Sequence, residues 1–139
     1  MKAKHSTESS SHSPDNMLLV GIDWADSKHD LTVIDRGNVK RLRIDSDAEA
    51  ICQMVSDLSK LAAGRQIAVC LEKGRVGNIH HMMLRDNVVL YPVDPKQAAR
   101  YRESFSSSGA KDDARDSYYL ARMLQERRGE MKPMKPDDP

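Results

Sequence analysis

Two acidic residues each stand directly after a run of apolar residues, where a strand would leave the core of a protein. Asp23 follows residues 17–22 (MLLVGI), and Glu72 follows residues 67–71 (IAVCL). Apolar runs of this length are consistent with strands that are buried on both faces of a sheet. A pair of carboxylates at the ends of such strands could act as a general acid and base or as ligands of a metal ion.

Two further acids, Asp113 and Asp116, lie three residues apart near the start of the last expected helix, on or beside one face of it. If they meet Asp23 and Glu72, four like charges require cations or protonation of some of the acids. Carboxylates in this number suit Mg²⁺ or Mn²⁺, and two such ions about 4 Å apart can stabilise both oxygens of a phosphodiester displacement. The alternative is that these acids are solvated ends of elements. For Asp112 we prefer a helix-capping role.

The elements that must position these acids begin with three strands, expected at residues 17–24, 30–34 and 39–44. Short turns between them predict an antiparallel meander. In the third strand Leu42 and Ile44 alternate with arginines, so one face of that strand is expected to be wet.

A helix is expected next, followed by the strand that ends at Glu72. Ser46 and Glu49 have the spacing of a capping box, and Gly64 ends the periodic run. The apolar stripe of this helix is expected to comprise Ala48, Ile51, Val55, Leu58 and Ala62. A strand, a crossover helix and a second strand predict a right-handed parallel connection. Asp23 and Glu72 would then emerge at the same edge of the sheet, where open sheets place their sites.

The second half of the chain continues the α/β pattern. We expect a short helix at residues 78–86, a fifth strand at residues 88–91 and a helix at residues 96–105. The buried stripe of the last helix is expected to comprise Ser117, Leu120, Ala121 and Leu124. His80 and His81 are neighbours in the short helix and point apart, so we do not expect them to share a metal ion. The pattern predicts a mixed five-stranded sheet, an antiparallel meander followed by parallel strands, with flanking helices.

A group of basic residues in the same half of the chain could complement the acids by binding phosphate. These residues are Arg100, Arg102, Lys111 and Arg115. The alternative is a solvated helix face, which is the reading that we prefer for Arg122, Arg127 and Arg128.

Composition sets the frame for these expectations. The chain has 139 residues, 39% hydrophobic and 31% charged, with a net charge of +1. These are values of one globular domain, which we place at residues 16–128, between a Ser-rich disordered tail (1–15) and a linker or frayed end (129–139). Because the chain has neither a signal peptide nor an apolar run long enough to span a membrane, we expect the cytoplasm and no membrane partner. Cys52 and Cys70 are read as small buried side chains rather than as a disulfide.

Four segments in order resemble one family of proteins. They are residues 21–30 (GIDWADSKHD), the acid of Leu71-Glu72, residues 91–95 (YPVDP) and residues 108–116 (SGAKDDARD). Together they look like the N-terminal domain of the DEDD-type transposases of the insertion sequence one-ten family, over about residues 17–128. The resemblance implies a RuvC-like (RNase H-like) fold.

The resemblance also implies a function and a set of site residues. The acidic tetrad of the family falls on Asp23, Glu72, Asp113 and Asp116, which would bind Mg²⁺ or Mn²⁺ and act in DNA strand cleavage and exchange. Asp113 is chosen over Asp112 by the Lys-x-Asp-x-x-Asp spacing. The implied partners are DNA, a guide (bridge) RNA and, in the full-length family, further copies of the protein.

The sequence departs from the family pattern in its length. Family members continue into a second domain that carries the serine regarded as the nucleophile, and this sequence stops at Pro139. We therefore expect a metal-binding catalytic domain that is inactive alone, as a truncated product, an excised domain or a short relative. Two alternatives stay open: a stand-alone metal-dependent nuclease acting on structured DNA, and a non-catalytic nucleic-acid-binding or assembly module.

Overall fold

A mixed sheet of five strands forms the centre of the molecule. The computed structural model describes residues 16–74, 85–105 and 116–134. The strands are β1 (Leu18–Asp23), β2 (Lys28–Asp35), β3 (Asn38–Asp45), β4 (Ile67–Glu72) and β5 (Val88–Val93), in the spatial order β3-β2-β1-β4-β5. β1 pairs antiparallel with β2 and β2 with β3, whereas β4 pairs parallel with both β1 and β5. The predicted meander and parallel strands are therefore confirmed.

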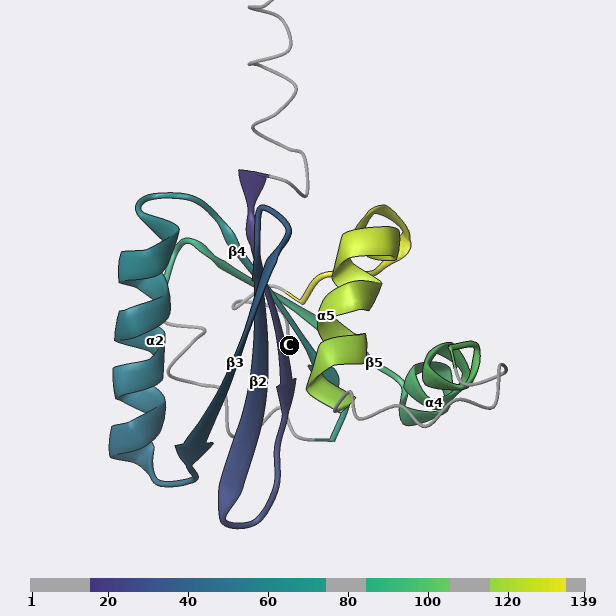
Figure 1. The fold of residues 1–139 in the computed structure, drawn as a ribbon, viewed down its shortest axis with the longest axis horizontal. Coiled ribbons are helices and arrows are strands. Elements are labelled where there is room, and N and C mark those ends of the chain that lie inside the picture. The colour runs from purple at the N-terminus through teal and green to yellow at the C-terminus, as the bar shows by residue number, and fades with distance from the viewer. Residues whose placement is uncertain (1–15, 75–84, 106–115, 135–139) are drawn as a thin grey trace, which may run out of the picture.

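Helices cover both faces of the sheet, which Figure 1 shows nearly edge-on. Helix α2 (Ala48–Ala62) lies on one side, and α4 (Pro95–Glu103) and α5 (Asp116–Arg127) lie on the other. The arrowheads of β1 and β4 and the first turn of α5 lie at the same end of the molecule (Figure 1).

The two central strands bury both of their faces, as their continuous apolar runs predicted. Leu18, Val20 and Ile22 of β1 join the core beneath α2, while Leu19 joins the core beneath α5. β4 follows the same alternation, since Val69 faces the α2 side and neighbouring residues face the other. All odd-numbered positions of β1 therefore share the α5 side of the sheet.

Two predictions about α2 are wrong by small shifts along the chain. The N-cap residue is Asp47, whose side chain accepts a hydrogen bond from the Ala50 amide at 2.7 Å, and not Ser46. The amide of Ser46 donates to Ser27 O (3.1 Å), so this residue still belongs to the loop beside the sheet. Ala48 is exposed, and Met54 takes a place in the buried stripe with the other four predicted residues.

The two cysteines differ in their surroundings. Cys70 is buried in β4, as predicted, but Cys52 is exposed on α2, so its predicted burial is wrong. Both are free thiols, in agreement with the absence of a predicted disulfide. Cys52 follows Ile51 by one residue, and that step of about 100° around the helix carries it off the buried stripe.

The end of the described chain packs against the sheet. A 3₁₀ turn, η3 (Arg128–Glu130), follows α5, and the amide of Met134 donates to Leu90 O at 2.7 Å. Most of the predicted short helix at residues 78–86 lies outside the described residues. Among the helices that are described, none has the length and apolar character needed to cross a membrane.

Candidate functional site

Asp23 and Glu72 end two neighbouring parallel strands at the same level of the sheet. The pairing of β1 with β4 runs from Leu18 opposite Ile67 to Gly21 opposite Cys70. Extended by two residues, this register sets Asp23 beside Glu72, and adjacent strands lie about 4.8 Å apart. Both residues occupy positions on the α5 side of the sheet, and both are half-buried. Two of the predicted acids therefore lie side by side on one face.

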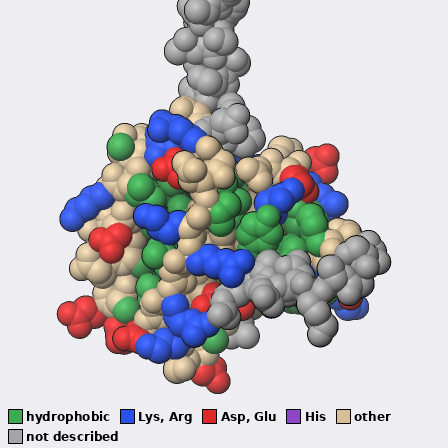
Figure 2. Space-filling view, viewed as in Figure 1, with side chains coloured by type: hydrophobic (Ala, Val, Ile, Leu, Met, Phe, Trp, Pro, Cys, Tyr) green, Lys and Arg blue, Asp and Glu red, His purple; other side chains and the backbone are tan. Residues whose placement is uncertain are grey.

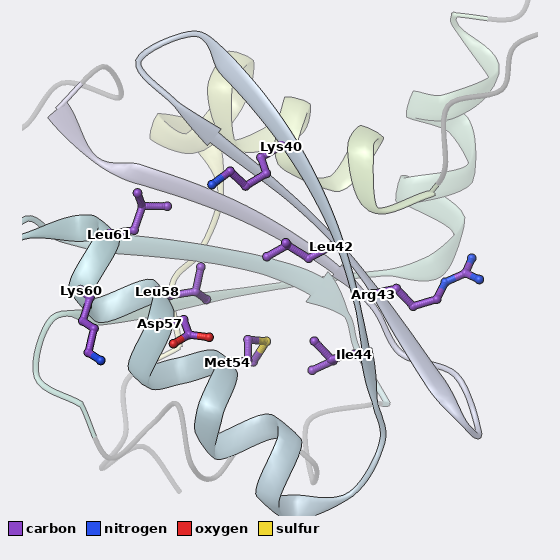
Figure 3. Close-up of a pocket in the computed structure, with 9 residues that line it drawn as sticks. All are labelled: Lys40, Leu42, Arg43, Ile44, Met54, Asp57, Leu58, Lys60 and Leu61. Atoms are coloured by element: carbon purple, nitrogen blue, oxygen red, sulfur yellow. The ribbon is translucent and has the colours of Figure 1, made fainter.

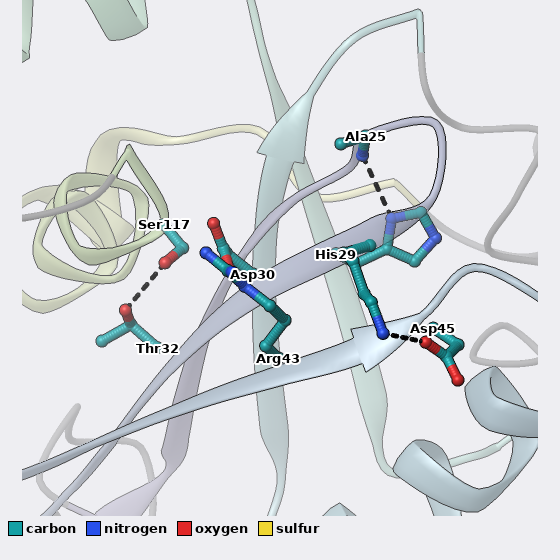
Figure 4. Close-up of polar contacts among 8 residues, drawn as sticks. Ala25, His29, Asp30, Thr32, Arg43, Asp45 and Ser117 are labelled. Carbon is teal, nitrogen blue, oxygen red and sulfur yellow. Dashed lines mark hydrogen bonds and ion pairs between the residues drawn. The ribbon is translucent and has the colours of Figure 1, made fainter.

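Gly21 lets α5 approach this part of the sheet. A Cβ atom at Gly21 would lie 2.1 Å from Ser117 O and 2.5 Å from Ala121 N, both backbone atoms of α5. Ser117 also shares a buried hydrogen bond of 2.9 Å with the Thr32 hydroxyl of β2, which Figure 4 shows. These contacts fix the first turn of α5 against β1 and β2. On β1 the contact is at Gly21, two residues before Asp23.

Asp116 stands at the start of α5, next to that anchored residue. Its Oδ1 lies 3.2 Å from Nη1 of Arg102 on α4, so a predicted metal ligand and a predicted phosphate ligand are paired with each other. The two side chains are 46% and 38% exposed. Exposed ion pairs of this kind contribute little free energy, so the pair can be exchanged for other partners at small cost.

Asp30 and Arg43 extend the row of charged side chains across the sheet. Asp30 lies directly opposite Asp23 in the β1–β2 pairing, and Arg43 lies directly opposite Asp30 in the β2–β3 pairing. Nε of Arg43 donates to Oδ1 of Asp30 at 2.8 Å (Figure 4). Like charges directly across a strand pair are destabilising, and the guanidinium offsets the charge of Asp30. Arg43–Asp30–Asp23–Glu72 thus form one line on the α5 side.

The position of Asp30 beside Asp23 was missed in the sequence because it depends on strand register. The signal was present only as an acid within a β-branched run, which does not show which residue will lie opposite.

The loop that follows Asp23 is held by an aromatic and a polar contact. The ring of buried His29 packs edge-on against Trp24 at a centroid distance of 4.3 Å. Nδ1 of His29 accepts a hydrogen bond from the Ala25 amide at 3.1 Å (Figure 4). His29 and Trp24 therefore fix the turn by which the chain leaves the acid.

Cys70 lies two residues before Glu72, on the same side of β4. Burial, and to a smaller extent the nearby charge of Glu72, raises the pKa of the Cys70 thiol to about 12. The thiol therefore stays protonated at neutral pH and is a poor nucleophile and metal ligand.

Several predicted site residues are not placed. Asp113, Lys111 and Arg115 lie outside the described residues. Arg100 is exposed on α4. Among described side chains, no three of the His, Cys, Asp and Glu type are close enough to hold a metal ion. The described chain thus brings together the pair Asp23 and Glu72, with Asp30 beside it, and holds Asp116 against Arg102.

A groove of about 530 Å³ lies on the other side of the sheet, between β3 and α2 (Figure 3). Its apolar wall includes Leu42, Ile44, Met54, Leu58 and Leu61. None of the predicted site residues lines it, so it is separate from the acids.

The chain is similar in sequence to proteins named as transposases, and similar in fold to RuvC. The family model DEDD_Tnp_IS110, described as "Transposase", matches residues 20–139. A Sinorhizobium fredii protein named "Putative transposase y4uE" is 28% identical over 110 residues, covering 75% of this chain and 30% of the relative. The "Mini-circle putative transposase for IS117" of Streptomyces coelicolor is 26% identical over 111 residues, covering 77% and 27%. The chain thus spans less than a third of the length of either relative.

Among solved structures, the chain is similar to RuvC of T. thermophilus, solved in complex with a Holliday junction substrate. The TM-score is 0.54 at 16% identity, over 85% of this chain and 99% of the RuvC chain. At this identity the match shows the fold, and it confirms the predicted RuvC-like architecture.

Proposed function

Because the chain belongs to the DEDD transposase family of IS110-type insertion sequences, we propose that it is the metal-binding catalytic domain of a transposase, acting on DNA phosphodiester bonds. The observation that carries the proposal is the placement of Asp23 and Glu72. They end adjacent parallel strands in register, on the sheet face to which Gly21 admits α5. This is the edge where open sheets place their sites.

The donor set at this edge fits a hard divalent cation. Asp23 and Glu72 supply carboxylate oxygens, which Mg²⁺ and Mn²⁺ prefer. In the proposal, Asp113 and Asp116 complete the set, as the family pattern implies. Asp116 would leave Arg102 and bind the ion. Because the pair is exposed, breaking it requires little free energy.

The residues around the acids have separate roles in the proposed reaction. A divalent ion held by the acids would supply charge stabilisation to the oxygens of the phosphodiester under attack. Arg102, once released by Asp116, would bind a phosphate next to the reacting one, together with Arg100, Lys111 and Arg115. The packing of α5 on Gly21 would hold Asp116 at a fixed distance from the sheet.

The whole transposition reaction is proposed to need more chain than this one. The relatives are more than three times as long as the parts matched here. We assign the strand-transferring nucleophile, any guide RNA contact and homo-oligomer formation to the full-length protein. The domain by itself is expected to bind Mg²⁺ and DNA without recombining DNA.

Isothermal titration calorimetry with Mg²⁺ and Mn²⁺ tests the proposal. The wild-type domain is expected to bind, whereas Asp23→Asn and Glu72→Gln should each weaken binding at least about tenfold, because each removes a charged oxygen ligand. Asp57→Asn is the matched control, since this substitution also removes one carboxylate, but from α2 on the opposite side of the sheet. Equal affinity in wild type and both site variants, or no binding by wild type, would contradict the proposal.

A second candidate is a nuclease that cleaves branched DNA by itself. It is favoured by the structural match, which covers 99% of the solved RuvC chain, so that nearly all of that chain has a counterpart in this one. Mg²⁺-dependent nicking of a four-way DNA junction by the 139-residue chain, lost in Glu72→Gln, would support it. Salt-sensitive junction binding that survives loss of all four acids, without nicking, would instead support a non-catalytic module.

A further inference from the structure

We infer that edge strand β3 binds the phosphate backbone of a nucleic acid through Arg41 and Arg43, which lie on the α5 side of the sheet. These two residues are called the β3 strip. The inference rests on the proposed function, because it names the surface along which a nucleic acid would reach Asp23 and Glu72. Of the residues expected from the sequence to bind phosphate, Arg100 and Arg102 lie on α4, which follows β5 at the opposite edge of the sheet.

The β3 strip lies on the same side of the sheet as the acids. Arg41 is opposite Thr32, and Arg43 is opposite Asp30. Thr32 contacts Ser117 of α5, which fixes that side of β2 as the α5 side. The alternate residues Leu42 and Ile44 face the groove beside α2. Arg43 borders that groove, and Figure 3 shows its side chain extending away from it. The strand therefore sends its arginines to the acidic side.

Arg43 is oriented by Asp30 in a way that leaves donors available. Asp30 accepts from Nε of Arg43, and the Arg43 side chain is 51% exposed. Among the described residues, the two terminal Nη groups have no hydrogen-bond acceptor. A guanidinium held by one edge can offer its other donors to a phosphate as a planar fork.

Arg41 adds a second cation one pleat further along the strand. It is exposed, and no described carboxylate pairs with it. Two residues along a strand correspond to about 6.8 Å, so the two guanidinium groups can reach different phosphates. Lys and Arg side chains follow one another down the middle of the face that carries β2 and β3 (Figure 2).

The arrangement places cations on both sides of the acids. β3 is one edge of the five-stranded sheet, and α4, with Arg100 and Arg102, follows β5 at the other. The two edge strands are about 19 Å apart, at four strand spacings. A backbone that crosses the end of the sheet would therefore meet positive charge before and after Asp23 and Glu72. Cations on an edge strand also prevent it from pairing with a strand of another molecule, and for that purpose either face of β3 would serve. Lys40, on the α2 side of β3, therefore distinguishes this protective role from phosphate binding.

Fluorescence anisotropy with a labelled four-way DNA junction tests the β3 strip, in titrations between about 50 and 200 mM salt. Each lost phosphate contact lowers the slope of log affinity against log salt by about 0.9. Arg41→Ala should therefore lower the slope by about one, and Arg41→Ala with Arg43→Ala by about two, while Arg41→Lys should retain it. Lys40→Ala is the matched control, since it removes the same charge from the neighbouring residue on the α2 side of β3.

The outcomes separate this inference from the proposed function. Junction binding by wild type with equal slopes in Arg41→Ala and Lys40→Ala would overturn the β3 strip and leave the metal site standing. Absence of wild-type binding to the junction at low salt would overturn both. A selective loss in the arginine variants, with unchanged circular dichroism, would support the strip.

Discussion

Gly21 shows how one residue type sets the distance between the sheet and the helix that carries Asp116. The backbone of α5 lies so close that a methyl group at this position has no room. Neither contact atom belongs to a flexible side chain, so only a shift of the whole helix could make space. The absence of a side chain at residue 21 is therefore a condition for the geometry of the site.

Gly21→Ala is expected to destabilise the domain by about 3 kcal/mol, the upper range for overpacking, because α5 must move away from β1. Urea unfolding followed by circular dichroism measures the change. Gly129→Ala is the control, since a Cβ at Gly129 meets nothing within 4 Å, and it should stay within about 0.5 kcal/mol of wild type. Equal stability of the two variants would contradict the close approach.

Asp30 lies between Asp23 and Arg43 in the sheet and offsets the charge of Arg43. In Asp30→Asn the charge of Arg43 would no longer be offset beside Asp23. A unit charge at about 10 Å in a solvated setting changes the binding of a cation by several tenths of a kcal/mol to about 1 kcal/mol. Divalent-ion affinity measured by calorimetry is therefore expected to fall about threefold or more. Asp57→Asn, which removes a carboxylate from α2 on the other side of the sheet, should have a smaller effect.

At the scale of elements, Arg65 joins the end of α2 to the end of β2. Its Nε donates to Ala62 O at 2.8 Å, and its Nη1 donates to Asp35 Oδ1 at 2.9 Å. The hydrogen bond and charge of Arg65 hold the pKa of Asp35 below its ordinary value of 3.8. A group with a lowered folded-state pKa stabilises the fold above its unfolded-state pKa and loses this contribution as the pH falls through the folded-state value.

Asp35→Asn is therefore expected to cost about 1 kcal/mol at pH 7, as a partly buried charge-assisted hydrogen bond is lost. The difference from wild type should shrink as the pH falls below about 3.8, where the wild-type carboxyl also becomes neutral. Thermal unfolding across pH 2 to 7, roughly the range spanning both states of the carboxyl, measures it. Asp26→Asn, at an exposed loop residue, is the control. A difference that stays constant with pH would contradict the pairing.

The elements also show what periodicity can and cannot determine. β4 occupies residues 67–72 as predicted, because its apolar run is bounded on both sides by polar and turn residues. The start of α2 shifted by one residue because Ser46 and Asp47 can both cap a helix, and the choice depends on the tertiary hydrogen bond from Ser46 to Ser27. Local sequence contains the candidates, whereas long-range contacts choose between them.

At the scale of the whole molecule, the two sheet faces differ in chemistry. The α2 side of β1 and β4 is apolar to the strand ends, whereas the α5 side ends in Asp23 and Glu72. This division follows from the two-residue period of a strand and was predictable once the strands were recognised. The pairing of Asp116 with Arg102, by contrast, joins two helices whose relative position depends on packing of the complete core, so the sequence could not predict it.

A divalent ion is proposed to bind at the adjacent ends of β1 and β4. Substoichiometric Mn²⁺ added to the ¹⁵N-labelled domain tests this directly, because a paramagnetic ion broadens the amide signals nearest to it. Signals of Asp23, Glu72 and their neighbours should broaden first in wild type and remain sharp in Asp23→Asn. Broadening centred on other acids such as Asp57 of α2, or the same pattern in wild type and Asp23→Asn, would contradict the claim.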